Sequence, residues 1–343
     1  MTGKPGRPRS NSKLTQPGAA TQLPIGVYRG ATVDISPIVA YEQFLGLPGT
    51  VDYVLAFAAD TPASWAQFET ATLPSVTNGA PGPSTAADWA PLLGDRNLML
   101  AVPACCMGSS WATEASGAND QHWAALARNL TAAGLGDAAL RIGRELNGSW
   151  YRWKVTPANL SDYLTAYPRI VNVMRSAGFT GQFVWNPYLG QGSFGPNSGA
   201  EVAYPGDSCV DVIGLDLYDG PSPNYPAGEI IRTPAQQQPT WASFRDQWDG
   251  LTGWRNLAVN HHKPLAYPEW GLRLWNDGAL YSGGGDNALF IREMAAWMQD
   301  TGAWMHAFWE DPGMGVADPD DHPRRLVAAP QARAAFLSAF GYQ

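Results

Sequence analysis

The stretch Ala138–Glu145 reads AALRIGRE, and the fold prediction starts from it. Apolar residues dominate its first half, and charged residues follow where the run ends. A second stretch of the same kind, Leu265–Gly271 (LAYPEWG), also carries a glutamate near its end. Short apolar runs that end in polar residues are typical of buried strands in a parallel sheet. We therefore predict a strand at each place, with a carboxylate at its carboxyl end.

Similar runs alternate with longer amphipathic stretches from residue 25 onward, and this alternation is typical of βα units. Eight such units favour a closed (β/α)8 TIM barrel over an open doubly wound sheet, which would more often have roughly five to seven strands. No GxGxxG or GxxxxGK[ST] motif follows the first run, so the nucleotide-binding alternatives lack their phosphate loop. The predicted strands are Ile25–Arg29, Val51–Ala58, Asn97–Pro103, Ala138–Glu145, Gln182–Pro187, Val210–Tyr218, Pro264–Glu269 and Ala303–Glu310.

Helical patterns lie between these strands. Thr156 and Pro157 supply an N-cap and a first-turn proline for one of them, and Gly178 follows its last turn as a stop signal. The predicted helices include Gln121–Ala133, Ala158–Ser176, Trp241–Asn260, Asn287–Thr301 and Gln331–Phe340.

The chain is predicted to form a single catalytic domain over residues 25–343. Residues 1–24 are rich in Pro, Gly, Ser and Thr, and they predict a flexible leader or the remnant of an attached segment. Basic residues in this leader are not followed by an apolar core, so it is not an intact signal peptide.

Composition narrows the kinds of partner. The 22 basic and 30 acidic residues give a formal charge of −8, without a long basic run, which argues against a nucleic acid or an anionic membrane. The chain contains 15 Trp, 13 Tyr and 11 Phe, and flat aromatic rings suit the apolar faces of sugars. Cys105, Cys106 and Cys209 do not form a disulfide framework, although the adjacent pair leaves a vicinal disulfide open. We expect a monomer that acts on a neutral substrate.

Two glutamates are the candidate catalysts. In (β/α)8 barrels the active site lies at the carboxyl ends of the strands, and the fourth and seventh strands lie nearly opposite each other. Glu145 and Glu269 would therefore face each other across the barrel mouth. Retaining glycosidases use such a pair, with the carboxyl groups roughly 5–5.5 Å apart. The alternative for either glutamate alone is an ion pair with a nearby arginine.

A family resemblance follows from five segments. The pattern RxxxExNGxWYxW, from Arg141 to Trp153, resembles the strand-four signature of glycoside hydrolase family 26 in clan A. Similar support comes from four shorter segments: PEWG at Pro268–Gly271, WNP at Trp185–Pro187, DxxGxDxY from Asp211 to Tyr218, and FW at Phe308–Trp309.

The resemblance implies roles for individual residues. Glu145 would be the acid/base, Glu269 the nucleophile, and Tyr218 a hydrogen-bond donor to the nucleophile. Trp150 and Trp309 would line the subsites on either side of the scissile bond, although Tyr218 and Trp309 could instead be core residues. Neither a metal nor an organic cofactor is implied. The full set of predicted substrate-binding residues is Arg144, Asn147, Trp150, Tyr151, Trp185, Tyr218, Trp270 and Trp309.

Arg144 departs from the family pattern, because family mannanases usually carry His immediately before the acid/base glutamate. Three roles are open to this arginine: it binds a sugar hydroxyl, pairs with a carboxylate, or recognises an anionic sugar. Its charge would also lower the pKa of the adjacent Glu145, an effect that burial must outweigh if Glu145 is to hold a proton.

Several features carry weaker predictions. Asp216 or Glu310 could replace one catalyst if the strand register differs. Asp318, Asp320 and Asp321 could form a calcium loop, but their spacing favours a solvated acidic loop. Gly283–Gly285 is interpreted as a flexible loop, and His261–His262 as surface residues at the opposite end of the barrel.

The resulting hypothesis is a retaining endo-β-glycoside hydrolase acting on β-mannan, β-1,3-xylan or mixed-linkage β-glucan. Two alternatives stay open: a non-catalytic barrel that binds glycans, and an exo-acting or transglycosylating enzyme on an unusual glycoside. A polymeric substrate predicts an extracellular location.

Overall fold

A computed structural model describes most of the predicted catalytic domain. The described residues are 23–28, 35–46, 49, 51–73, 85–190, 192–194, 199–220, 222–225, 232–273, 283–309 and 329–340. The leader up to residue 22, Glu310 and the acidic segment with Asp318, Asp320 and Asp321 lie outside these ranges, and so do the predictions made for them.

The strands form a closed parallel barrel. Every strand pairing is parallel, β1 pairs with both β2 and β9, and β6 pairs with β8. Because β6 and β7 both pair with β8, they are two halves of the sixth barrel strand, and β8 and β9 are the seventh and eighth. The predicted (β/α)8 barrel is thereby confirmed. The strands are β1 Ile25–Tyr28, β2 Val51–Phe57, β3 Asn97–Val102, β4 Ala139–Ile142, β5 Gln182–Trp185, β6 Val212–Gly214, β7 Leu217–Tyr218, β8 Leu265–Gly271 and β9 His306–Trp309.

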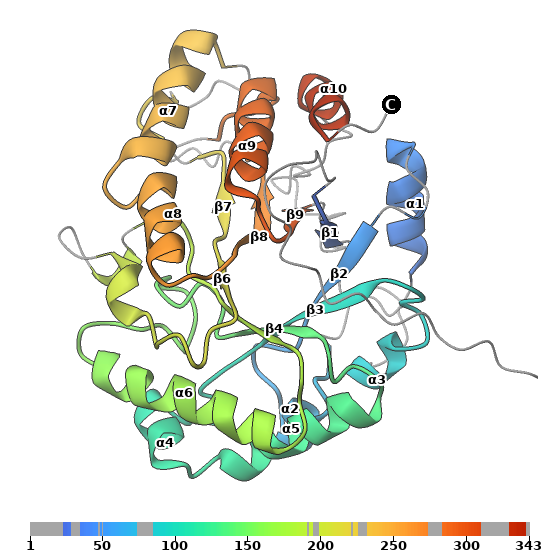
Figure 1. The fold of residues 1–343 in the computed structure, drawn as a ribbon, viewed down its shortest axis with the longest axis vertical. Helices are drawn as coiled ribbons and strands as arrows, with labels where there is room; N and C mark the ends of the chain where they lie inside the picture. The colour runs from blue at the N-terminus through green and yellow to red at the C-terminus, as the bar shows by residue number, and fades with distance from the viewer. Residues whose placement is uncertain are drawn as a thin grey trace, which may run out of the picture.

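Helices surround the barrel on its outer side (Figure 1). They are α1 Ser36–Leu45, α2 Trp65–Glu69, α3 Ala86–Trp89, α4 Trp111–Ser116, α5 Asp120–Ala132, α6 Leu160–Ser176, α7 Pro234–Asp246, α8 Leu251–Asn260, α9 Ala288–Thr301 and α10 Pro330–Ala339, with 3-10 turns at Gly192–Phe194 and Ala200–Ala203. Within the described ranges, no helix has both the length and the hydropathy that a bilayer span requires.

The helix predicted over Trp241–Asn260 is wrong as a single element. The structure divides it into α7 and α8, because Gln247 adopts an extended conformation and ends the first helix. Gly250 begins the second, and an added Cβ there would lie 2.7 Å from the carbonyl oxygen of Phe244. The periodicity of apolar residues continues across this break, so the sequence pattern did not reveal it.

Side chains alternate between the barrel interior and the helices. Leu55, Phe57, Met99 and Ala101 belong to a cluster inside the barrel, whereas their neighbours along the strands pack outward. Both faces of each strand are apolar, which explains the nearly continuous hydrophobic runs of the sequence.

A bulge in β8 changes this alternation at the rim. Tyr267 pairs with His306 and Trp270 with Phe308, so β8 has one residue more than β9 over the same distance. An extra residue on one strand turns the following side chains toward the other face. This irregularity directs Glu269 into the barrel mouth and Trp270 outward against the helices.

Candidate active site

The structure brings Glu145, Asp216 and Glu269 together at the carboxyl ends of the strands. One carboxylate oxygen from each residue lies within 4.8 Å of the others. Asp216 and Glu269 are buried, and Glu145 is partly exposed. Three carboxyl groups this close repel one another when they are all ionised, so the site needs positive charge or protons.

A sharp turn after β4 presents Glu145. Its φ of 49° lies in the left-handed region, which costs a non-glycine residue about 1–2 kcal/mol. Two backbone hydrogen bonds hold the turn: the amide of Glu145 donates to the carbonyl of Asn186 at 2.6 Å, and its carbonyl accepts from the amide of Gly148 at 2.7 Å. Strained residues of this kind concentrate at functional sites.

The surroundings of Glu145 favour its protonated form. Burial is the largest cause, and the negative charge of Glu269 adds to it, so that the pKa of Glu145 rises to about 7. A hydrogen bond from Trp150 Nε1 to Glu145 Oε2 (2.9 Å) and the charges of Arg144 and Arg141 act in the opposite direction. Burial and the Glu269 charge together outweigh them.

Arg141 lies between the other two carboxylates. Its Nη2 donates to Glu269 Oε1 and to Asp216 Oδ2, each at 2.5 Å, and its Nε donates to Asn186 Oδ1. The hydroxyl of Tyr218 donates to the second oxygen of Glu269 at 3.1 Å. Glu269 thus accepts two donors that stabilise a negative charge, whereas Glu145 accepts one from an indole.

Asp216 and Asn186 are part of this cluster, and sequence reasoning identifies them only in part. The sequence predicts Asp216 only as a replacement catalyst, and Asn186 only as part of the WNP motif at Trp185–Pro187. Burial raises the pKa of Asp216 well above its usual value, although Arg141 opposes the effect. The Asp216 carboxyl lies close enough to the glutamates for a metal ion, but Arg141 already holds two of the three carboxylates. The donor set therefore suits a buried guanidinium rather than a divalent cation.

Arg144 pairs with a carboxylate, one of the three roles open to it. Its guanidinium donates to both oxygens of Asp60 (2.9 and 3.1 Å) and to the hydroxyl of Tyr151 (2.8 Å). Its Cζ atom lies 4.6 Å from the ring centroids of both Phe57 and Tyr151. Sequence reasoning missed Asp60, although its position just beyond β2 follows the same strand-end rule that selected the glutamates.

Trp150 and Trp309 lie at the barrel mouth. Trp150 is 56% exposed, and its indole covers Gly148, where an added Cβ would lie 2.5 Å from the ring. Trp309 stacks on Tyr28 at a centroid distance of 4.3 Å and meets the ring of Phe57 nearly edge-on. Both indoles therefore lie where a sugar chain that enters the mouth could contact them.

Three predicted substrate-binding residues do not face the site. Asn147 is fully buried, and its side-chain amide is bonded to the backbone of Tyr188 and Gly190, so it shapes a loop instead. Trp185 points outward from β5, with its Nε1 donating to the hydroxyl of Tyr163.

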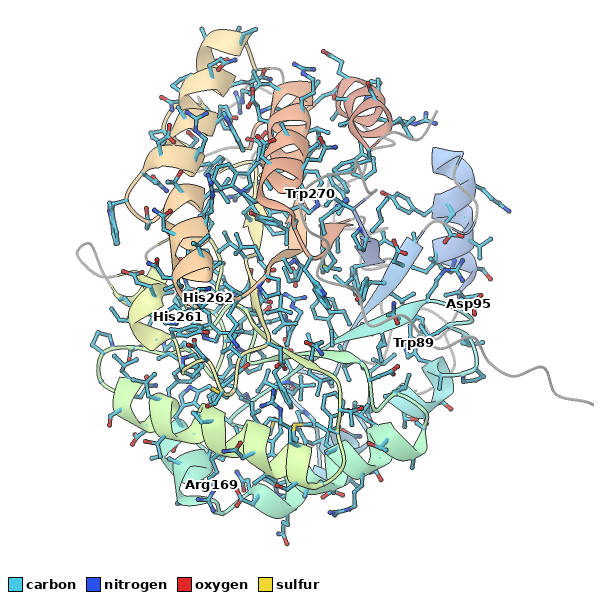
Figure 2. All side chains as sticks on the ribbon, viewed as in Figure 1. Trp89, Asp95, Arg169, His261, His262 and Trp270 are labelled. Atoms are coloured by element: carbon cyan, nitrogen blue, oxygen red, sulfur yellow. The ribbon has the colours of Figure 1, made fainter. Side chains whose placement is uncertain are left out.

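Trp270 also points away from the barrel mouth, because the β8 bulge turns it outward. Figure 2 marks its position. Its indole is fully buried, donates to His306 Nδ1 and packs against Phe290 of α9 and Phe336 of α10. It stabilises the contact between the barrel and its last helices.

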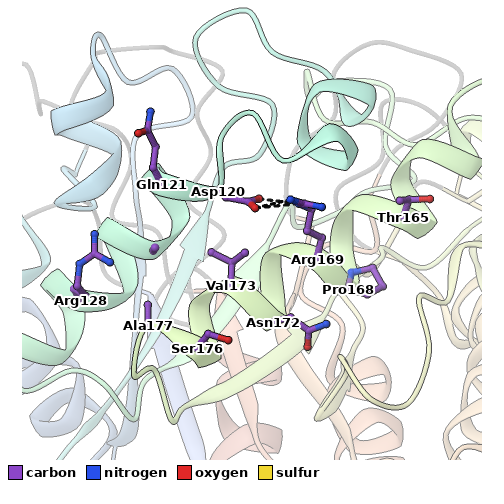
Figure 3. Close-up of a pocket in the computed structure, with 11 residues that line it drawn as sticks. Asp120, Gln121, Arg128, Thr165, Pro168, Arg169, Asn172, Val173, Ser176 and Ala177 are labelled. Carbon is purple, nitrogen blue, oxygen red and sulfur yellow. Dashed lines mark hydrogen bonds and ion pairs between the residues drawn. The ribbon is translucent and has the colours of Figure 1, made fainter.

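An open groove occurs elsewhere, on the outer surface between α5 and α6 (Figure 3). Its lining includes the ion pair of Asp120 with Arg169 and none of the predicted site residues. The groove is therefore separate from the carboxylate cluster.

The fold and the site together define a class: a (β/α)8 barrel with one glutamate at the rim of its fourth strand and another on its seventh. Comparison with known proteins makes the assignment more specific. The model of glycosyl hydrolase family 26 matches residues 122–231, a segment that contains Glu145 and Tyr218. The resemblance to family 26 inferred from the motifs is thus confirmed over this segment.

Individual relatives agree with this match. A mannan endo-1,4-β-mannosidase of Bifidobacterium adolescentis is 40% identical over 76 residues, which are 22% of this chain and 8% of that protein. An endo-β-1,4-mannanase double mutant of Cellulomonas fimi superposes with a TM-score of 0.59 at 16% identity, over 94% of this chain and 71% of that one. The catalytic domain of a family 26 endo-β-1,4-mannanase from Bacillus sp. JAMB-750 superposes with a TM-score of 0.55 at 15% identity, over 93% of this chain and 86% of that one. At these identities, the structural likeness shows a shared fold.

Proposed function

We propose that this protein is a retaining, endo-acting β-glycoside hydrolase whose first candidate substrate is a β-1,4-linked mannan. The observation that carries the proposal is the pair Glu145 and Glu269, whose carboxylate oxygens approach within 4.8 Å. A separation of roughly 5–5.5 Å between carboxyl groups is typical of double displacement, whereas inverting enzymes need roughly 6.5–9.5 Å to admit a water.

The two glutamates have the different environments that this mechanism needs. Glu145, with its raised pKa, would donate a proton to the glycosidic oxygen as the bond to the anomeric carbon breaks. Glu269, held by Arg141 and Tyr218, would attack that carbon and form a glycosyl ester. After the aglycone leaves, Glu145 would remove a proton from water, which then hydrolyses the ester and regenerates both groups.

The surroundings of Arg144 support a neutral substrate. An arginine without a carboxylate partner beside the acid/base would suit a uronate. In this protein Nη1 and Nη2 of Arg144 both donate to the carboxylate of Asp60. The mannanases among the similar proteins favour mannan over β-1,3-xylan and mixed-linkage glucan as the first test.

The test is a panel of β-1,4-mannan, β-1,3-xylan and mixed-linkage β-glucan, with products analysed by size and by anomeric configuration. We expect a ladder of oligosaccharides from mannan, with the β-configuration retained in the first product seen by proton NMR. An α-anomer as the first product would refute double displacement. Folded protein without turnover on any of the three polymers would refute the proposed activity.

Replacement of Trp150 by Phe should extend activity toward higher pH. The indole hydrogen bond stabilises the ionised form of Glu145, so its loss should raise a pKa that is already about 7. Since the first step requires protonated Glu145, the basic limb of the kcat/KM profile should move upward.

Trp297→Phe is the matched control for this change. It also removes one indole hydrogen bond, to the hydroxyl of Tyr267, but on the outer side of β8. Its profile should stay that of the wild type. A basic limb that moves downward in Trp150→Phe would contradict the assigned effect of the indole.

A further inference from the structure

Arg144 is held by five contacts on the side of the barrel mouth next to Glu145. Two hydrogen bonds join it to Asp60, one joins it to Tyr151, and the rings of Phe57 and Tyr151 lie against its guanidinium. Its residue exposure is only 7%, whereas the side chain of Asp60 is 39% exposed. The arginine is therefore a fixed charge, and Asp60 is its accessible partner.

This fixed charge acts directly on the catalytic pair. Arg144 is the chain neighbour of Glu145, and its positive charge opposes the protonation of that carboxyl. A bidentate carboxylate neutralises most of the field of a guanidinium at longer range. The electrostatic effect of Arg144 on Glu145 thus depends on whether the carboxylate of Asp60 is paired with the guanidinium.

We propose that Asp60 is a positioning residue for the reaction: it fixes Arg144 against Phe57 and Tyr151 and compensates the charge beside the acid/base Glu145. The pair replaces the histidine that the resemblance leads one to expect before the acid/base. At this position the chain places an arginine together with its own counter-ion, Asp60, which the loop after β2 supplies.

Other charged and titratable groups also act on Glu145, and all of them except Arg144 stay the same in the test. They come from β4, from the loop that follows it and from β5 to β8. The charged and titratable ones are Arg141, Arg144, Tyr151, Tyr188, Asp216 and Glu269. Of these groups, Arg144 is the one to which Asp60 is joined by two hydrogen bonds, at 2.9 and 3.1 Å.

The proposal rests on the proposed function, and it predicts shifts of opposite sign. In Asp60→Asn, uncompensated Arg144 should stabilise ionised Glu145, so the basic limb of kcat/KM should move to lower pH by about 0.5 unit or more. In Arg144→Gln, the positive charge is gone and Asp60 stays, so the limb should move to higher pH. The double variant should return close to the wild-type profile, because the two changes remove a neutral pair.

Asp120→Asn is the matched control, because Asp120 holds Arg169 in the same two-pronged way between α5 and α6 (Figure 3). It should leave the profile unchanged. If Arg144→Gln does not fold, the pH profile of Asp60→Asn alone tests the proposal. The Asp60 side chain is partly exposed, and circular dichroism shows whether this variant is folded.

Shifts of equal sign in both single variants, or a limb that does not move in folded Asp60→Asn, would overturn the role of Asp60. Those outcomes leave wild-type turnover intact and are thereby distinct from failure of the proposed function, in which the wild type itself is inactive on every polysaccharide of the panel.

Discussion

Replacement of Glu269 by Gln is expected to reduce hydrolysis of a polysaccharide substrate to the background, and Glu145→Gln is expected to lower kcat by roughly 10²–10⁴-fold. Glu269→Gln removes the nucleophile while it keeps the shape of the side chain. Initial rates of reducing-end release measure both effects, with circular dichroism as the check on folding.

Substrates with a good leaving group separate the two roles. An aryl glycoside with an acidic phenol needs little proton donation, so Glu145→Ala should still form the glycosyl ester and accumulate it. Added azide should then accelerate turnover, because it attacks the ester without a general base. Glu269→Ala should gain nothing from such a substrate. Equal responses of the two variants would contradict the assignment of acid/base and nucleophile.

Replacement of Arg141 by Met is expected to destabilise the fold by about 3–5 kcal/mol. The guanidinium is 1% exposed and holds Asp216 and Glu269, so its loss leaves two buried carboxyl groups without their counter-ion. The free energy of unfolding in urea measures the effect, and lower pH should restore part of the stability because protonated carboxyls no longer repel each other.

Arg169→Met provides the comparison on the surface. Its ion pair with Asp120 is exposed, and exposed pairs contribute little to stability. A loss of stability in Arg141→Met that is no greater than in Arg169→Met would show that the buried cluster does not depend on its arginine.

The sequence was sufficient for the barrel and for the position of the candidate catalytic glutamates at its rim. Apolar runs of strand length recur regularly, and the rim rule for (β/α)8 barrels places Glu145 and Glu269 at the carboxyl ends of two opposed strands. Both deductions depend on local pattern and on general topology, which one sequence contains.

Orientation within the strands was harder to predict. Trp185 and Trp270 stand in motifs beside site residues, yet alternation along β5 and the bulge in β8 turn both outward. Asp60 and Arg144 are 84 residues apart, and no local pattern links them. Bulges and long-range ion pairs depend on tertiary packing, and the periodicity of apolar residues in the sequence contains no information about it.

The unequal burial of the tryptophans has a consequence for spectroscopy. Trp123, Trp153, Trp185 and Trp270 are fully buried, whereas Trp150 is 56% exposed. Intrinsic fluorescence of the native protein should be dominated by the buried set, which makes it a sensitive reporter of helix detachment and a weak reporter of ligand occupancy. The fluorescence change on ligand binding would be measurable only as the difference between the wild type and a variant in which Trp150 is replaced by a non-fluorescent residue.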